Sequence, residues 1–347
     1  MGADTLSDVL RAVRLTGAVF VDVDVTVPWS AWAAQASKLL PVIMPGAQHL
    51  ISYHLVTEGE CYAVPQGGEA VRLRAGDVIV FPHGDAHALS SDANLPPGPG
   101  FDVNRLRPTA QRPHRIHGGG GGARVKVICG FLGCDVRPFN PLLAALPSKI
   151  HCNGHDYPSN ARLSQLYQMA VAESHEQRVG GESVLAKLSE LMFIEVVRRY
   201  LETLPEEQTG WLAGLRDRHV GHALSLLHGQ PAREWTLDEL AKEVGLSRSA
   251  LAERFALFVG LPPIHYLAKW RMQMAAALLA DGQASIAQVA SEVGYESEAA
   301  FNRAFKREFG LPPAQHRKRY AAIDTNAAAA VQSSADMRTA DHPLVRR

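Results

Sequence analysis

Residues 289–313 read VASEVGYESEAAFNRAFKREFGLPP, and residues 240–263 carry a second version of the same pattern, LAKEVGLSRSALAERFALFVGLPP. The two copies share Ala-x-Glu-Val-Gly near their start, a phenylalanine in their middle and Gly-Leu-Pro-Pro at their end. Each copy has the residue types of a short helix, a glycine-centred turn and a second helix. A pattern of this kind written twice predicts paired helix-turn-helix units.

The first copy carries local signals for both of its helices. Thr236, with Glu239 three residues later, predicts a capping box that opens the first helix. Gly245 ends this helix, because glycine adopts the left-handed conformation that a sharp helix end requires. Ser247 is the predicted N-cap of the next helix, whose helical spacing places Phe255 toward the core.

The second copy repeats this design, and a long helix is predicted between the two. Gly294 supplies the second turn, and Phe305 is expected in the core beneath the second helix. Residues 265–280 contain no glycine or proline and keep apolar residues near helical spacing, which predicts a connecting helix of roughly 24 Å. This length suits two recognition helices about 34 Å apart, in successive major grooves on one face of DNA.

The layout closely resembles the DNA-binding domain of the AraC/XylS family of bacterial transcription regulators, over residues 219–320. The most diagnostic stretch is GYESEAAFNRAFKREFGLPPAQHRKRY, at residues 294–320. The competing structural interpretation is a helical bundle that merely contains duplicated helix pairs. The resemblance implies DNA contacts from the outer face of the second helix in each copy, which carries Arg248, Ser249, Ala252 and Glu253 in the first and Glu298, Ala299, Asn302, Arg303 and Lys306 in the second.

The overall charge does not indicate a nucleic-acid partner, since Lys and Arg number 35 and Asp and Glu also number 35. Any DNA affinity must therefore come from local clusters of cations, such as the one in residues 303–319. The sequence contains no apolar run of about eighteen residues, so no membrane span is predicted. The N-terminus lacks the pattern of a secretion signal, and four cysteines without framework spacing fit a reduced cytoplasm.

Short strands separated by Gly and Pro predict a β-sandwich or barrel in the first half of the chain. The motif GDVIVFPHGDAHALS, at residues 76–90, resembles the second cupin motif through Gly76, Pro82, Gly84 and His87. Upstream, SYHLVTE at residues 52–58 resembles the first cupin motif, with a serine in place of its first histidine. This resemblance implies a cupin-like effector domain of the kind that some AraC-type regulators carry.

His54, Glu58 and His87 form the candidate set for an effector pocket or a metal site. Two histidines and one carboxylate are a donor set that binds iron in oxygen-using enzymes. The missing first histidine removes one ligand from the cupin set, so we expect no cofactor, while a metal at these three residues stays an open alternative. The competing function is accordingly a metal-dependent cupin enzyme fused to a DNA-binding domain.

Cys129, Cys134 and Cys152 are candidates for a redox switch, because reactive thiols sense oxidants in some regulators. Their spacing is not a recognised zinc pattern, and a buried cysteine is more often a small apolar side chain. We therefore keep both an oxidant and a small molecule as the signal. Three interpretations remain open for these thiols: redox sensing, metal binding and a purely structural role.

The sequence thus predicts an α+β protein, with a cupin-like β-barrel followed by an all-α domain of two helix-turn-helix units joined by a long helix. We expect a cytoplasmic transcription regulator, an activator or a repressor, that binds promoter DNA in response to an effector and is not an enzyme. A homodimer and contact with RNA polymerase are further expectations. The predicted segments are an effector domain at 5–158, a packing or dimerisation segment at 159–204, a linker at 205–218, the DNA-binding domain at 219–320 and a disordered tail at 321–347.

Overall fold

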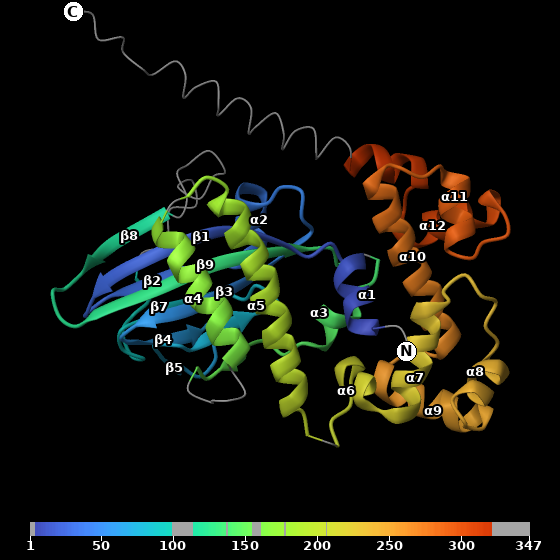
Figure 1. Cartoon of the computed structure of the whole chain (residues 1–347), viewed down its shortest axis with the longest axis horizontal. Helices are drawn as coiled ribbons and strands as arrows, with labels where there is room; N and C mark the ends of the chain where they lie inside the picture. Colours follow the sequence, from blue (N-terminus) through green and yellow to red (C-terminus); the bar gives the residue numbers. More distant parts are fainter. Residues whose placement is uncertain are drawn as a thin grey trace, which may run out of the picture. The chain divides into compact units, whose positions relative to one another are not determined.

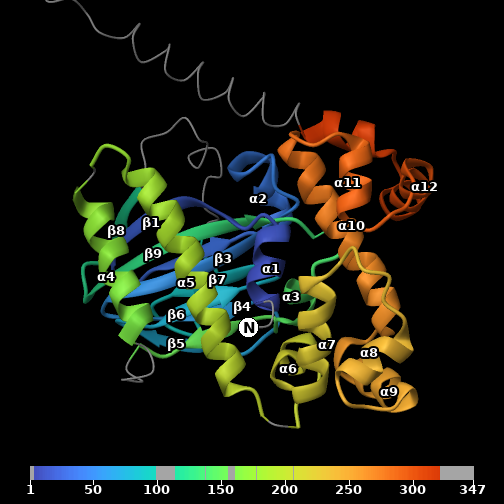
Figure 2. The ribbon, with the colours of Figure 1, turned by 45° about the vertical axis from the view of Figure 1, so that its right-hand side comes forward.

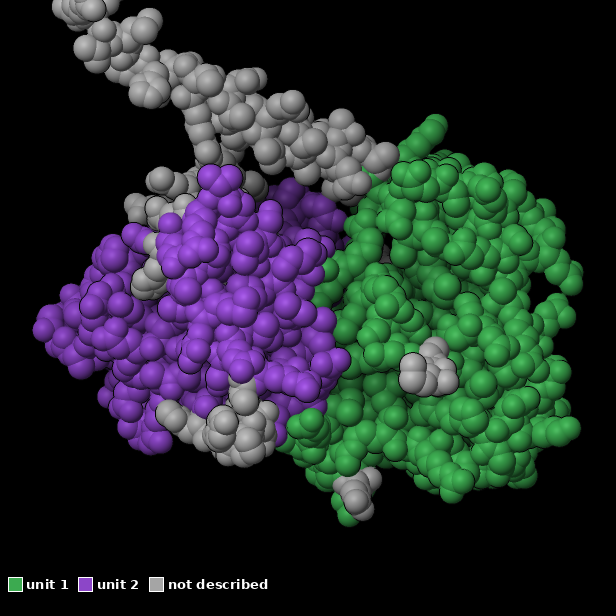
Figure 3. All heavy atoms as spheres, in the orientation of Figure 1, with its two compact units in different colours: residues 1–15, 135–146, 200–321 green, residues 16–134, 147–199, 322–347 purple. Residues whose placement is uncertain are grey.

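The computed structural model describes residues 4–98, 114–136, 138–154, 161–176, 178–205 and 207–320. The chain divides into two compact units (Figure 3). Unit 2 contains residues 16–134 and 147–199, and unit 1 contains residues 1–15, 135–146 and 200–321. The predicted tail at 321–347 lies outside the described residues. Among the helices of the described part, none combines the length and the apolar character needed to cross a membrane.

Unit 2 is built on two β-sheets that follow largely antiparallel pairing (Figure 1). A six-stranded sheet has the order β10-β6-β3-β9-β1-β8, and a four-stranded sheet has the order β2-β7-β4-β5. Among the paired strands of the described residues, only β1 and β8 run parallel. The strands are β1 (Thr16–Thr26), β2 (Ser30–Ala33), β3 (His49–Glu58), β4 (Glu60–Pro65), β5 (Val71–Arg74), β6 (Val78–Phe81), β7 (His87–Ser90), β8 (His114–Gly119), β9 (Arg124–Cys134) and β10 (Ile150–Cys152).

The core of unit 2 follows from the alternation of side chains along these strands. One face of the six-stranded sheet points into the barrel, where it buries residues such as Val23, Leu50 and Val56. The long helices α4 (Ala161–Glu176) and α5 (Gly181–Thr203) run across its other face (Figures 1 and 2). The hydroxyls of Tyr53 on β3 and Ser189 on α5 lie 2.8 Å apart, which ties α5 to the sheet. The short helix α2 (Ala36–Ile43) packs beside β3.

Unit 1 is all-helical and contains two helix-turn-helix pairs, which we call the first pair (α8 and α9) and the second pair (α11 and α12). The two pairs lie at opposite ends of α10 (Figure 2). At a rise of 1.5 Å per residue, the 19 residues of α10 span about 28 Å. The helices are α1 (Thr5–Ala12), α3 (Pro141–Ala145), α6 (Trp211–Arg216), α7 (Arg218–Gly229), α8 (Leu237–Glu243), α9 (Arg248–Val259), α10 (Pro263–Asp281), α11 (Ile286–Glu292) and α12 (Glu298–Phe309).

The predicted fold class is confirmed, with a β-rich first part and an all-helical second part. The compact units nevertheless differ from the predicted segments in two places. The predicted linker at 205–218 contains α6, because Trp211 and Leu212 are buried and anchor it. In addition, α1 and residues 135–146 belong to unit 1 although both fall in the predicted effector domain at 5–158, because α1 packs against α7 and α10.

Candidate functional site

The second helix of each pair presents the residues that the sequence predicts as DNA contacts. Ser247 Oγ accepts a hydrogen bond from the Ala250 amide at 3.2 Å, and Ser297 caps α12 in the same way. Phe255 and Phe305 are fully buried and fix the inner faces of α9 and α12. The outer faces are exposed or half-buried and carry Arg248, Ser249, Ala252 and Glu253 on α9, and Glu298, Ala299, Asn302, Arg303 and Lys306 on α12.

The turns before these helices have the predicted geometry. Gly245 has a φ of 73° and Gly294 a φ of 80°, in the left-handed region that favours glycine. At Gly294 a side chain would also collide, because an added Cβ would lie 2.7 Å from the Ala232 backbone. The capping box predicted at Thr236 is present, and Ser285 with Gln288 forms a second one at the start of α11. In both pairs, therefore, a capping box starts the first helix and a glycine turn leads into the second helix.

The cations of α9 and α12 differ in their partners. On α9, Arg254 Nε lies 3.1 Å from a carboxylate oxygen of Asp217, and Arg248 lies 3.5 Å from Asp238. On α12, Arg303 and Lys306 are exposed, and no carboxylate within the described part of the chain pairs with either. The outer face of α12 therefore has the more available positive charge.

Unit 2 contains a cavity of about 110 Å³ against the inner face of its sheets. Its wall is almost entirely apolar, and both β1 and β9 contribute to it. None of the lining residues carries a formal charge at neutral pH, because His54 is neutral there: burial holds its pKa well below the ordinary value. The lining residues are Val21, Val23, Trp29, Ala31, Trp32, Ala33, Ala34, Leu39, His54, Leu89, Ile116, Cys129 and Phe131.

Two of the three predicted pocket residues lie together. The Nε2 atoms of His54 and His87 are 2.6 Å apart, and both side chains are buried. The His87 ring stacks on Phe81, with centroids 3.9 Å apart. Burial lowers the pKa of His87 to about 4, so both rings are neutral at physiological pH. Of this pair, His54 lines the cavity.

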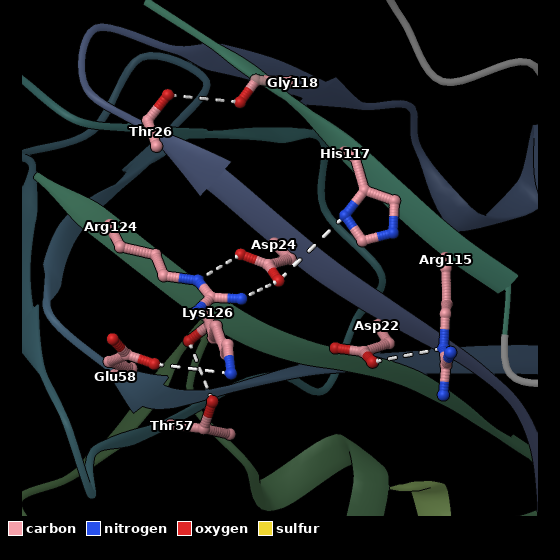
Figure 4. A network of polar contacts seen from close by, with 10 residues as sticks. All are labelled: Asp22, Asp24, Thr26, Thr57, Glu58, Arg115, His117, Gly118, Arg124 and Lys126. Carbon is pink, nitrogen blue, oxygen red and sulfur yellow. Dashed lines mark hydrogen bonds and ion pairs between the residues drawn. The ribbon is translucent and has the colours of Figure 1, made fainter. Parts of the chain in front are cut away.

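Glu58 does not join the two histidines, which corrects the candidate three-residue set for an effector pocket or a metal. The register between β3 and β9 shifts between Val56 and Glu58, because two residues of β3 there oppose one residue of β9. This bulge turns Glu58 away from the inner face that strand alternation predicts for it. Its carboxylate instead lies 3.4 Å from Lys126 Nζ, in a row of ion pairs (Figure 4). Among the described residues, no group of three or more His, Cys, Asp or Glu is arranged to hold a metal ion.

The candidate redox cysteines are buried thiols at three separate positions. Cys129 opposes His54 across the β3–β9 ladder, Cys134 is the last residue of β9, and Cys152 pairs with Val78. Burial raises the pKa of the Cys129 thiol well above its usual value. A buried thiol with a raised pKa is a poor nucleophile, because the thiolate is the reactive form.

Comparisons with known proteins agree with a β-rich N-terminal part and a helical C-terminal part. Residues 4–202 match a cupin family, and residues 240–319 match a helix-turn-helix domain family. An AraC-like transcription regulator of Streptomyces lividans is 35% identical over 78% of this chain and 88% of its own length. The regulator AlkR of Acinetobacter baylyi is 31% identical over 78% of this chain and 89% of its own. These relatives are transcription regulators and not enzymes.

A solved structure matches part of the chain. The crystal structure of the DNA-binding domain of AdpA, a global transcriptional factor, in complex with a target DNA is 26% identical. The match covers 30% of this chain and 95% of that one, with a TM-score of 0.29.

Trp29 is a cavity residue that sequence reasoning missed. It precedes β2 and lies outside both cupin-like motifs, so no motif marks it. The Ser91 hydroxyl, 62 residues away in sequence, holds its backbone through the Trp29 amide at 3.0 Å. A tryptophan at the start of a short strand was the only available signal, and it does not distinguish a core residue from a cavity residue.

Proposed function

Because the chain belongs to the AraC family of transcription regulators, in a branch with an N-terminal cupin domain, we propose that an apolar effector in the cupin cavity controls its binding to promoter DNA. The chain is a DNA-binding transcription regulator. The observation that carries the finer proposal is the uncharged, apolar cavity whose walls include β1 and β9. Apolar walls with few polar groups are typical of small-molecule sites.

The effector proposal is tested on the full chain with a promoter fragment and a screen of apolar compounds. A compound that enters the cavity should raise the melting temperature and change promoter affinity, because it binds one state better than the other. Ala33→Phe fills part of the cavity and should abolish the response to the compound while leaving promoter binding in its absence. A response that survives Ala33→Phe unchanged would contradict the cavity as the site.

An oxidant is the second candidate signal, and the cysteine geometry gives it less support. Burial raises the pKa of Cys61 to about 12, and the Cys129 thiol is shifted in the same direction. An oxidant response that is lost in Cys129→Ala and kept in Ala33→Phe would favour the redox signal over the apolar effector. The opposite pattern is the one we expect.

For DNA recognition, we propose that α9 and α12 enter successive major grooves. The exposed outer faces of both helices and the length of α10 between them support this arrangement. The availability of Arg303 and Lys306 supports a larger contribution from α12. Homodimerisation through α4 and α5 is a further proposal, supported by the exposed apolar side chains of Met169, Val184 and Leu191. RNA polymerase contact and a cytoplasmic location stay predictions.

Arg303→Ala should weaken binding to the specific operator by about 1 to 3 kcal/mol and relax the preference at one base position. The reason is that a guanidinium on the outer face of α12 can donate two hydrogen bonds to guanine. The comparison variant is Lys306→Ala, which should weaken operator and unrelated DNA alike because a lysine contacts phosphate as a point charge. Fluorescence anisotropy titrations at fixed salt measure both effects. Unchanged operator selectivity in Arg303→Ala would show that Arg303 does not contact a base.

Acid should destabilise unit 1 between pH 7.5 and pH 5.5. Burial lowers the pKa of His228 to about 3 and that of His316 to about 4. Since the unfolded chain takes up these protons near pH 6.5 and the folded chain does not, stability is lost as the pH falls from 7.5 to 5.5, by about 3 kcal/mol for the two groups. The carboxyls of Asp8 and Asp135, whose pKa burial raises, act in the opposite direction.

Urea unfolding at the two pH values measures this loss. His316→Phe keeps an aromatic ring beside Phe305 and Phe309 and should remove part of the pH dependence. His222→Phe changes an exposed histidine of the same unit and should leave the pH dependence as it is. Equal pH dependence in both variants would show that His316 is not the titrating group.

A further inference from the structure

Two polar atoms on side chains that line the cavity are buried and have no hydrogen-bond partner within the described protein. They are Nδ1 of His54 and Nε1 of Trp29. Buried polar groups in native proteins nearly always have a partner, so each exception calls for an explanation. Seven buried side-chain atoms of the described residues lack a partner, and only these two belong to residues that line this cavity, so a molecule bound there would lie beside both.

The hydrogen-bond chain of the two histidines fixes what His54 Nδ1 can do. His87 Nδ1 lies 2.8 Å from the Asp85 carbonyl oxygen, which only accepts, so this nitrogen carries the proton. In a neutral ring the other nitrogen, Nε2, is then an acceptor. It lies 2.6 Å from His54 Nε2, which must therefore donate. Consequently Nδ1 of His54 has no proton and is a hydrogen-bond acceptor without a donor.

Trp29 provides the complementary group. An indole Nε1–H can only donate. The Trp29 backbone is held on both sides by Ser91, whose hydroxyl accepts from the amide at 3.0 Å and donates to the carbonyl at 3.1 Å. The residues of the wall therefore carry one acceptor and one donor without partners, beside an otherwise apolar surface.

The cavity wall also excludes a charged group. None of its residues is Asp, Glu, Lys or Arg, and His54 is neutral. An ion moved from water into such a wall would lose its hydration without gaining a counter-charge. A carboxylic acid with a pKa near 4.3 would have to enter protonated, which would weaken its apparent affinity about 500-fold at pH 7.

Building on the proposed function, we infer that the cavity binds a neutral, largely apolar molecule with a hydroxyl group, an alcohol or a phenol. Its O–H donates to His54 Nδ1, and the molecule offers an oxygen to the Trp29 indole N–H. The apolar body fills the space between the strands. Simple hydrocarbons leave both polar atoms without a partner, and carboxylates bring an uncompensated charge.

The test uses three neutral probes of eight heavy atoms each, by calorimetric titration of the full chain. Benzyl alcohol donates and accepts, its isomer anisole only accepts, and ethylbenzene does neither. We compare the ratio of the anisole Kd to the benzyl alcohol Kd between the parent and His54→Leu, because the different hydration of the probes cancels in this comparison. The ratio should fall about tenfold in His54→Leu. In the control Leu89→Ala, which enlarges the same cavity without touching a polar atom, the ratio should stay the same.

Trp29→Phe tests the donor independently and covers the case in which His54→Leu fails to fold. It should lower the preference for anisole over ethylbenzene about fivefold. Unchanged ratios in the folded variants would overturn the hydroxyl inference, and so would benzoate binding as tightly as benzyl alcohol. The cavity proposal itself would stand in those cases if Ala33→Phe still weakens all three probes. If none of the probes binds the parent, the cavity proposal and this inference fail together.

Discussion

Phe305→Ala should unfold the second helix-turn-helix pair at a cost of about 3 to 5 kcal/mol. Phe305 is fully buried on α12 and stacks on Phe309 with ring centroids 4.1 Å apart. Its ring also meets those of Phe301 and His316, at 5.5 and 5.2 Å. Removing it leaves a cavity that these rigid rings cannot close. Because α12 depends on this core for its position, specific promoter binding should be lost with it.

Urea unfolding of the full chain, together with promoter binding, measures this effect. The matched control is Lys306→Ala, the next residue on the same helix, which is exposed and should change stability by less than about 0.5 kcal/mol. A Phe305→Ala protein that unfolds at the same urea concentration as the parent would show that the ring is not part of the core. Weaker promoter binding in Lys306→Ala at unchanged stability would separate the loss of a DNA contact from the loss of the fold.

The helix-turn-helix pairs could be predicted because their determinants are local in sequence. The Thr236 capping box, the Gly245 and Gly294 turns and the burial of Phe255 each depend on residues within about one or two helical turns. The structure has all four features. The resemblance of these pairs to a known family then predicted a DNA-binding transcription regulator. The comparisons with known proteins confirm this function.

The face of Glu58 could not be predicted, because a bulge in a strand depends on its partner strand. From His54, simple alternation places Glu58 on the same face. The register shift against β9 reverses this, and Glu58 pairs with Lys126 on β9. Trp29 is a similar case, since a serine far along the chain positions it. A single sequence does not show which strands pair, so it does not show where alternation breaks.

Contacts between residues far apart in the sequence also determine which segments belong to unit 1. Gln273 on α10 and Ala12 at the end of α1 are separated by 261 positions, yet the Gln273 amide donates to the Ala12 carbonyl at 2.8 Å. Residue patterns within one helix show that α1 has an apolar face but do not show which helices cover it. The same limit applies to α6, whose Trp211 donates to the Tyr266 hydroxyl at 3.0 Å.

Gln273→Met should destabilise unit 1 by about 2 to 4 kcal/mol, because it leaves the buried Ala12 carbonyl without this partner, at about 1 to 3 kcal/mol, and removes the hydrogen bond to the half-buried Phe139 amide, at about 1 kcal/mol. Gln273 is fully buried, donates to the Ala12 carbonyl and accepts from the Phe139 amide at 3.2 Å. Methionine keeps the length of the side chain and removes both hydrogen bonds. Gln315→Met makes the same chemical change at an exposed site of unit 1 and should have little effect.

Urea unfolding measures the loss, and hydrogen exchange locates it, since the Phe139 amide should exchange faster in Gln273→Met alone. The two backbone segments that Gln273 holds are continuous with cavity strands: Ala12 precedes β1 by four positions, and β9 ends at Cys134, five residues before Phe139. Asp135 joins these segments to each other, because its amide donates to the Val13 carbonyl at 2.8 Å. We therefore expect movement of β1 or β9 around an effector to be passed along the chain to the two segments that Gln273 holds. In Gln273→Met the effector should still bind but should change promoter affinity less, whereas a full response would show that the signal travels by another route.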